Sequence, residues 1–240
     1  MVPDLAKGAE TMLENFRPGV MERLGLGYGA IREVNRRIIY ASLSGFGQEG
    51  PYAQRPAFDM IALGMGGLMS ITGEPGRPPA RLGSSMGDIG ASLFTCISIL
   101  AALHEREKSG QGQHIDVAML DSQVALCENA CARYFATGEI PGPLGSRHPL
   151  FTPFQAFPTR DGYVVVVAQL PDDWKRFCEA AGREEWLTDE KYLSMEARLE
   201  YYDEFICEMN ALMRTRTTEE WIGLLDAHRV MCGPVNNIEQ

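Results

Sequence analysis

Apolar and polar positions along the first 145 residues predict strands that alternate with helices. Short branched apolar runs at residues 37–43 and 114–120 are typical of buried strands, and an apolar stretch at 11–16 indicates the end of a third. A long helix with a buried apolar side is predicted from Met86 to about Lys108. Further helices are expected at residues 21–24, 28–35, 58–70 and 121–135. This alternation favours a parallel sheet of the α/β class.

The pattern changes after a segment rich in turn-forming residues. Residues 138–153 hold four prolines and three glycines, which indicates a domain boundary near residue 145. Asp161-Gly162 lies between two apolar segments and predicts a β-hairpin. Helices are then expected at residues 172–181, 195–213 and 219–228, the last opened by a capping box at Thr217. We therefore predict an α/β domain over 1–145 and a smaller α+β domain over 146–240.

Composition and charge restrict the class of protein. The net charge of -10 argues against a general nucleic-acid binder, because such a surface repels phosphate backbones. The longest uncharged apolar run, Ile89 to Leu103, is about 15 residues, shorter than the roughly 20 that span a bilayer, so no membrane contact is expected. No signal peptide is visible. The six cysteines lack metal-binding spacing, so we expect no metal and a reducing cytoplasmic location.

Asp88 is the first candidate for chemistry. It stands at the predicted start of the long helix, between Gly87 and Gly90. One interpretation is a plain N-cap, since aspartate is among the best capping residues. The other is a carboxylate held at the positive end of a helix, where the glycines let a substrate carbonyl approach. Arg17, Arg23 and Arg55 are loop residues that either bind phosphate or are simply solvated.

Several sequence blocks in fixed order resemble the class III CoA-transferases, the family of formyl-CoA, carnitine and bile-acid CoA-transferases. The blocks cover almost the whole chain: residues 14–19, 24–28, 44–47, 50–52, 87–88, 105–113, 116–119, 154–162 and 234–235. The resemblance implies a Rossmann-like large domain, here in part, followed by a small α+β domain. It also implies an interlocked homodimer that uses acyl-CoA and a small carboxylic acid as substrates.

The same resemblance implies roles for individual residues. Asp88 matches the family's nucleophile, which passes through an aspartyl anhydride and an aspartyl-CoA thioester. An aspartate carboxylate is ionised at neutral pH and needs no separate base. We expect backbone N–H groups of residues 87–90 to stabilise the oxyanion. Coenzyme A contacts are implied at Asn15, Phe16, Arg17, Arg23, Arg55, Pro56, Ala57 and Phe58.

Two alternative functions are open at this point. An α-methylacyl-CoA racemase exchanges a proton through a histidine 30 residues before the aspartate, and this chain has Phe58 there. The chain is also shorter than the family's usual length of about 400 residues, so a non-catalytic CoA-binding protein is a second alternative. The donor and acceptor acids are not readable from the sequence. The glycine-rich loop of formyl-CoA transferase is not evident near the domain boundary, which counts against a formyl or oxalate specialist. Arg147 and His148 are candidates for binding the second carboxylate of a dicarboxylic acid.

Overall fold

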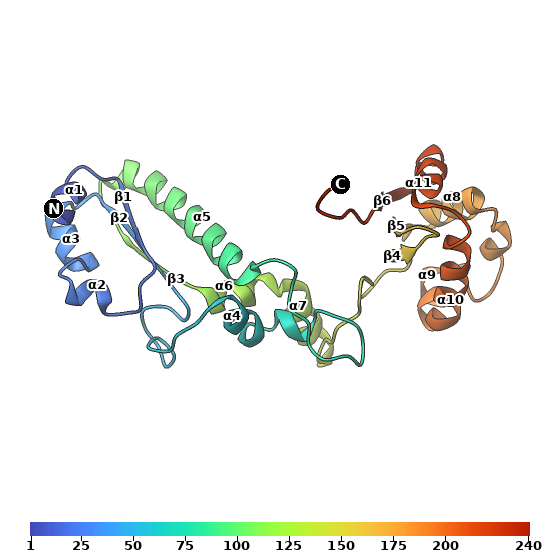
Figure 1. Cartoon of the computed structure of the whole chain (residues 1–240), viewed down its shortest axis with the longest axis horizontal. Helices are drawn as coiled ribbons and strands as arrows, with labels where there is room; N and C mark the ends of the chain where they lie inside the picture. Colours follow the sequence, from blue (N-terminus) through green and yellow to red (C-terminus); the bar gives the residue numbers. More distant parts are fainter. The chain divides into compact units, whose positions relative to one another are not determined.

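The computed structural model describes residues 1–240 and divides into two compact units, Met1–Pro143 and Leu144–Gln240 (Figure 1). The division lies two residues before the boundary chosen from the sequence, 145/146. Each unit has its own sheet and its own buried core, so each is described separately.

The first unit is built on a parallel sheet of the order β1-β2-β3. Its strands are β1 (Thr11–Glu14), β2 (Ile39–Ser44) and β3 (His114–Ala118). The central strand β2 is buried at every position except Leu43, as its run of apolar residues predicted. Short helices connect β1 to β2, and a long helix connects β2 to β3. The helices of this unit are α1 (Val2–Ala6), α2 (Val20–Arg23), α3 (Tyr28–Val34), α4 (Asp59–Met65), the 3-10 turn η1 (Leu68–Ser70), α5 (Met86–Ser109), α6 (Met119–Leu126) and α7 (Glu128–Thr137).

Two predicted helices of the first unit are interrupted in the structure. The helix expected at 58–70 ends at Gly66, and Gly67, with φ at 98°, opens the 3-10 turn. A Cβ atom at Gly66 would collide with the side chain of Gln123, so this glycine lets α4 lie close against α6. The helix expected at 121–135 divides at Cys127 into α6 and α7.

The long helix α5 differs from the prediction in its burial. Small residues including Gly90, Ala91 and Ala102 are buried against the rest of this unit, Gly90 against α6, but only 28% of the apolar window is buried. By length and composition alone α5 is also long enough to cross a membrane, a weak criterion that core helices of soluble proteins also meet. The apolar run that indicated a buried helix therefore includes one apolar face that nothing in the first unit covers. The exposed large residues on it are Ile89, Leu93, Phe94, Ile97 and Leu100.

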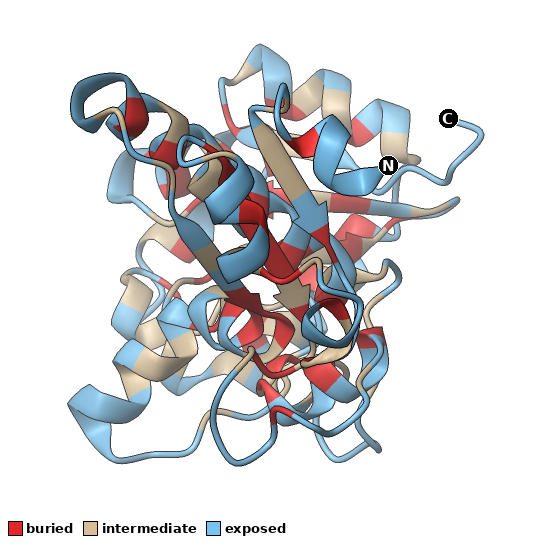
Figure 2. Cartoon of the chain, turned by 90° about the vertical axis from the view of Figure 1, so that its left-hand side faces the viewer, coloured by how far each residue is buried: buried red, intermediate tan, exposed pale blue.

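The second unit is an antiparallel sheet packed against helices. Its strands are β4 (Phe154–Pro158), β5 (Tyr163–Val167) and β6 (Met231–Pro234), and β4 and β5 form the predicted hairpin. The helical segments are α8 (Pro171–Ala181), the 3-10 helix η2 (Glu184–Leu187), α9 (Met195–Glu200), α10 (Tyr202–Met213) and α11 (Thr218–Ala227). The predicted helix at 195–213 divides at Tyr201, and the capping box at Thr217 is confirmed. Trp174, Trp186 and Trp221 lie in its core, and Figure 2 shows the buried residues in red.

The fold class is therefore as predicted. A parallel α/β unit precedes an α+β unit, and the carboxyl ends of β1 and β2 meet at one edge of the parallel sheet. In open α/β sheets ligands usually bind at this edge.

Candidate functional site

A cavity of about 210 Å³ opens at the carboxyl edge of the parallel sheet. Three segments form it: the residues after β1, the end of β2, and the loop that precedes α4. The lining residues are Asn15, Phe16, Arg17, Pro18, Ser44, Gly45, Ala53, Arg55, Pro56, Ala57 and Phe58. Seven of the eight residues expected to bind coenzyme A are thus brought together, although they are up to 43 positions apart in the sequence.

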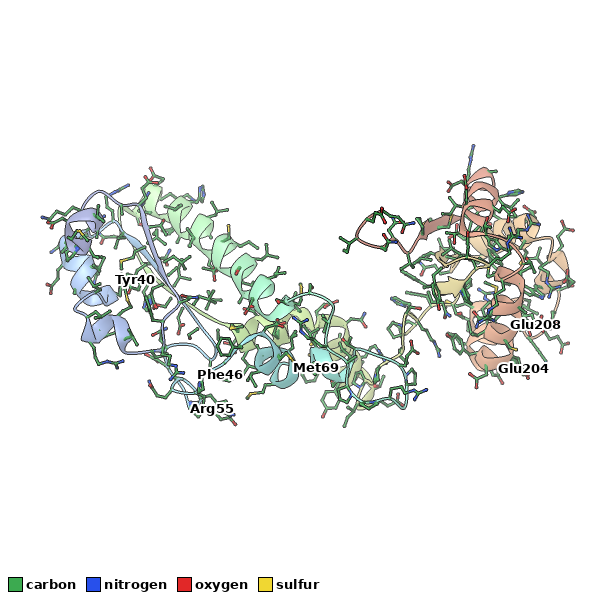
Figure 3. The ribbon with its side chains drawn as sticks, viewed as in Figure 1. Tyr40, Phe46, Arg55, Met69, Glu204 and Glu208 are labelled. Atoms are coloured by element: carbon green, nitrogen blue, oxygen red, sulfur yellow. The ribbon has the colours of Figure 1, made fainter.

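Local contacts hold the walls of this cavity in place. The Glu14 carboxylate is buried and accepts a hydrogen bond of 2.8 Å from the backbone N–H of Phe16, which holds the turn after β1. Gly45 allows the two loops to meet, because a Cβ atom there would collide with that of Ala57. The Arg55 guanidinium lies 4.7 Å from the ring centre of Tyr52 and also contacts Phe46, which Figure 3 shows close by.

The polar groups of the cavity suit an anion. Neither Arg17 nor Arg55 forms an ion pair with a carboxylate. The Ser44 hydroxyl is buried and has no hydrogen-bond partner. Phe16 and Phe58 are largely exposed, at 52% and 81%. Two guanidinium groups, an unpaired hydroxyl and two exposed rings fit a ligand that carries both phosphate and a flat or apolar part.

The remaining predicted contact, Arg23, does not line the cavity. It is the last residue of α2, and its guanidinium lies beside Gly19 in the loop before that helix. Sequence reasoning named the Ser44-Gly45 block as part of the resemblance but did not assign Pro18, Ser44, Gly45 or Ala53 to the site. All four line the cavity.

Asp88 is the third residue of α5, not its N-cap. The N-cap position is Ser85, and the Asp88 backbone N–H donates to the Ser85 carbonyl at 3.1 Å. The Asp88 side chain is exposed and forms no hydrogen bond or ion pair within the chain. The plain capping interpretation is therefore wrong, and the carboxylate oxygens are accessible.

The cap of α5 comes from a different helix. Asp59, the first residue of α4, accepts a hydrogen bond of 2.8 Å from the Gly87 backbone N–H through Oδ1 and is 9% exposed. A Cβ atom at Gly87 would collide with Asp59. Gln123 of α6 donates to the carbonyls of Met86 and Gly87 at 3.3 Å. The start of α5 is thus held by two buried side chains that sequence reasoning missed, although Asp59 directly follows Phe58 of the cavity.

The expected oxyanion site at residues 87–90 is contradicted by the hydrogen bonds of this turn. Gly87 donates its N–H to Asp59, and the N–H groups of Asp88 and Ile89 both donate to the Ser85 carbonyl. Gly90 lies within the helix, where its N–H belongs to the helical ladder. None of these N–H groups is left to bind a substrate oxygen.

The two boundary-loop candidates have contacts within the second unit. The Arg147 guanidinium lies 3.6 Å from the ring centre of Tyr202. The His148 ring stacks on the rings of Phe151 and Phe154 at 4.9 and 4.8 Å. Both side chains take part in packing this unit.

Comparison with known proteins adds independent information. The family model of CoA-transferase family III matches residues 1–240. An acyl-CoA transferase of Fusarium pseudograminearum is 37% identical over 239 residues, which is 100% of this chain and 52% of that protein. An acetyl-CoA:oxalate CoA-transferase of Acetobacter aceti is 35% identical and is covered to 61%, with 99% of this chain aligned. A succinyl-CoA:mesaconate CoA-transferase of Haloarcula hispanica is 37% identical, with 97% of this chain and 59% of that protein aligned.

Solved structures agree with the sequence comparison. The crystal structure of a CaiB/BaiF family protein from Brucella suis superposes with a TM-score of 0.88 at 32% identity. The match covers 99% of this chain and 63% of that one. The chain thus spans between about half and two thirds of the length of the proteins it matches.

Proposed function

Because the chain belongs to CoA-transferase family III, we propose that it transfers coenzyme A from an acyl-CoA thioester to a carboxylic acid. The observation that carries the proposal is Asp88, an exposed carboxylate without a hydrogen-bond partner at the start of a helix. Because Asp59 caps that helix, Asp88 is available to react. The nearby cavity with Arg17 and Arg55 suits the phosphates of coenzyme A, which enters as a substrate.

The reaction begins when an Asp88 carboxylate oxygen attacks the thioester carbon of the donor. The C–S bond breaks, the CoA thiolate leaves, and Asp88 is joined to the acyl group as an anhydride. The thiolate attacks the Asp88 carboxyl carbon, which releases the donor acid and leaves an aspartyl-CoA thioester. The acceptor carboxylate attacks that carbon and displaces the thiolate. The thiolate attacks the acceptor carbonyl, which frees Asp88 and forms the new acyl-CoA without net proton transfer.

Trapping the activated aspartate tests this mechanism. Incubation with acyl-CoA and hydroxylamine should convert Asp88 to a hydroxamate, detected by peptide mass spectrometry, while Asp88→Asn should abolish CoA transfer. Asp121 is a matched control, because it is also an exposed third residue of a helix, α6. Asp121→Asn should transfer CoA at the wild-type rate. Absence of the hydroxamate from wild-type protein during turnover would exclude the covalent mechanism.

Binding and exchange assays separate the alternatives. A non-catalytic CoA-binding protein would bind coenzyme A equally well with Asp88→Ala but would exchange nothing between acyl-CoA and free acids. A racemase would place deuterium at the α-carbon of a branched acyl-CoA in heavy water. The cavity wall has Phe58 at the position of the racemase histidine, and a phenyl ring exchanges no proton.

The proposed acceptor is a small dicarboxylic acid. Oxalate and mesaconate, which appear in the names of two of the relatives above, are both dicarboxylic acids. A panel of monocarboxylic and dicarboxylic acids, with one acyl-CoA as donor, tests this choice. Faster transfer to monocarboxylic acids throughout the panel would contradict it.

We also propose a homodimer, with the exposed face of α5 at the contact between two copies. Ile89, Leu93, Ile97 and Leu100 follow helical spacing on one side of α5 and are 45–62% exposed. Light scattering should give twice the 26.5 kDa of one chain, and Ile97→Glu should lower the mass toward one chain. Leu170→Glu, at a similarly exposed position of the second unit, is the control. A wild-type mass of one chain would contradict the dimer. The cytoplasmic location stays a prediction from the sequence.

A further inference from the structure

Arg81 contacts the N-cap residue of α5, the helix that carries the proposed nucleophile, and has no role in the mechanism above. It belongs to the loop between η1 and α5, and its side chain is 45% exposed. Its Nη2 donates to Asp59 Oδ2 and to Ser85 Oγ, each at 3.3 Å. These are long hydrogen bonds made by one nitrogen.

A single carboxylate connects Arg81 to the turn that carries Asp88. Asp59 binds Arg81 through Oδ2 and the Gly87 N–H through Oδ1, and Asp88 is the next residue. The guanidinium is therefore held at the start of α5. A guanidinium has five N–H donors, and Nε and Nη1 of Arg81 make no hydrogen bond in the structure. The Nε–H and Nη1–H groups lie on different sides of the guanidinium, so each offers a separate charge-assisted hydrogen bond to a carboxylate.

The charges around Asp88 create a need for such a cation. An acceptor acid must bring a carboxylate to a site that already holds the carboxylates of Asp59 and Asp88, and a dicarboxylic acid brings a second negative charge. The helix N–H groups cannot compensate, because they are all donated within the protein. The loop of residues 71–85 holds two cations, Arg77 and Arg81, and only Arg81 is bound to the start of α5.

We propose that Arg81 binds the second, non-reacting carboxylate of a dicarboxylic acid acceptor and so selects dicarboxylic over monocarboxylic acids. This inference rests on the proposed CoA transfer through Asp88. It assigns the choice of acceptor to a residue outside the cavity proposed for coenzyme A, since Arg81 is not among the residues that line that cavity. Coenzyme A binding should therefore be independent of Arg81.

Comparing two acids of equal chain length tests the assignment. Succinate and butyrate differ at one end, where succinate has a carboxylate and butyrate a methyl group. With propionyl-CoA as donor, wild-type protein should show the higher kcat/KM for succinate. Arg81→Gln should lower the succinate value by about 10- to 100-fold, the range of a lost charge-assisted hydrogen bond, and leave the butyrate value within about 3-fold. Arg81→Lys should lie between, because lysine keeps the charge but not the fixed planar arrangement of N–H donors.

Arg77→Gln is the matched control, because Arg77 lies on the same loop and has no ion pair. It should leave the ratio of the two kcat/KM values unchanged. Equal losses with both acids in Arg81→Gln would mean that Arg81 acts only by holding Asp59, and the assignment would be overturned. Equal use of both acids by wild-type protein, with the Asp88 hydroxamate present, would overturn it as well. No transfer to either acid and no hydroxamate would instead refute the proposed function.

Discussion

Replacing Asp59 with alanine removes the side chain that caps α5 from outside the helix. The Gly87 N–H loses an acceptor at 2.8 Å, and Arg81 loses a partner at 3.3 Å. A hydrogen bond to a charged group contributes about 1.5–3 kcal/mol, and a half-exposed ion pair adds about 0–1 kcal/mol. The favourable interaction of the Asp59 charge with the start of α5 is already partly included in the value for the hydrogen bond. We therefore expect the free energy of unfolding of the first unit to fall by about 2–4 kcal/mol.

Two further variants separate the contributions of charge and position. Asp59→Asn keeps an oxygen that accepts from Gly87 but loses the charge, so a smaller loss of about 1 kcal/mol is expected. Ser85→Ala removes the side chain of the formal N-cap residue, which normally costs about 1 kcal/mol. Here the Ser85 hydroxyl accepts no bond from its own helix, so we expect less than about 0.5 kcal/mol.

Urea unfolding with two optical signals measures these changes. All three tryptophans lie in the second unit, so their fluorescence reports that unit, while far-ultraviolet circular dichroism reports the helices of both. Asp59→Ala should shift the dichroism transition and leave the fluorescence transition in place. The reasoning is refuted when Asp59→Ala matches wild type within about 0.5 kcal/mol, a typical surface effect, or when Ser85→Ala costs as much as Asp59→Ala.

Three other predictions concern buried groups. Arg198 is buried and donates to two backbone carbonyls at 3.1 and 2.8 Å, so Arg198→Ala should destabilise the second unit by about 3–5 kcal/mol, seen as an earlier fluorescence transition in urea; an unchanged midpoint contradicts this. Burial raises the pKa of the Cys178 thiol to about 12, so iodoacetamide at pH 8 should modify exposed Cys96 and Cys207 first and Cys178 only in urea; early labelling of Cys178 would argue against this core. Burial, and then two nearby glutamates, raise the pKa of Tyr40 to about 12. Since an unfolded tyrosine titrates near 10, the resulting stabilisation is complete below about pH 10 and is lost as the pH rises to about 12. Tyr40→Phe should flatten this decline in unfolding free energy, and an equal decline in both proteins would contradict the assignment.

Features that depend only on residues close together in the sequence were predictable. The long helix was placed from Met86 to about Lys108, and the structure ends it at Ser109, with Gly110 in the left-handed conformation as its C-cap. The capping box at Thr217 was likewise readable, because its partner Glu220 is three residues away. These signals need no knowledge of the rest of the chain.

The cavity was predictable in most of its residues for a different reason. Asn15 to Arg17 and Ser44-Gly45 follow neighbouring parallel strands, so chain direction alone brings them to one edge of the sheet. The resemblance to a known family is what implied coenzyme A contacts at Asn15 to Arg17 and at the loop Arg55 to Phe58. Arg23 does not line the cavity, because the direction of its side chain depends on how the single turn of α2 packs beside Gly19. No periodic pattern reports that packing.

The burial of α5 could not be read from its apolar residues. The same run, Ile89 to Leu103, indicates an apolar helix whichever surface covers it. In the structure Gly87, Gly90, Ala91 and Ala102 are buried against the rest of the first unit, while larger residues such as Leu93, Ile97 and Leu100 are exposed. The sequence pattern identifies apolar faces but does not say which molecule packs on them.

Asp59 and Asp88 show why a nucleophile is hard to recognise from its neighbours alone. Each aspartate lies in the first turn of a helix, where a negative charge is generally favourable. The structure gives the two roles to residues 29 positions apart: both oxygens of buried Asp59 accept hydrogen bonds, from Gly87 and Arg81, and neither oxygen of exposed Asp88 does. The Asp88 carboxylate, near the positive end of a 24-residue helix, is left without a partner because another group satisfies the N–H of Gly87. The proposed reactivity of Asp88 therefore depends on Asp59, and removing Asp59 should slow CoA transfer even where the fold survives.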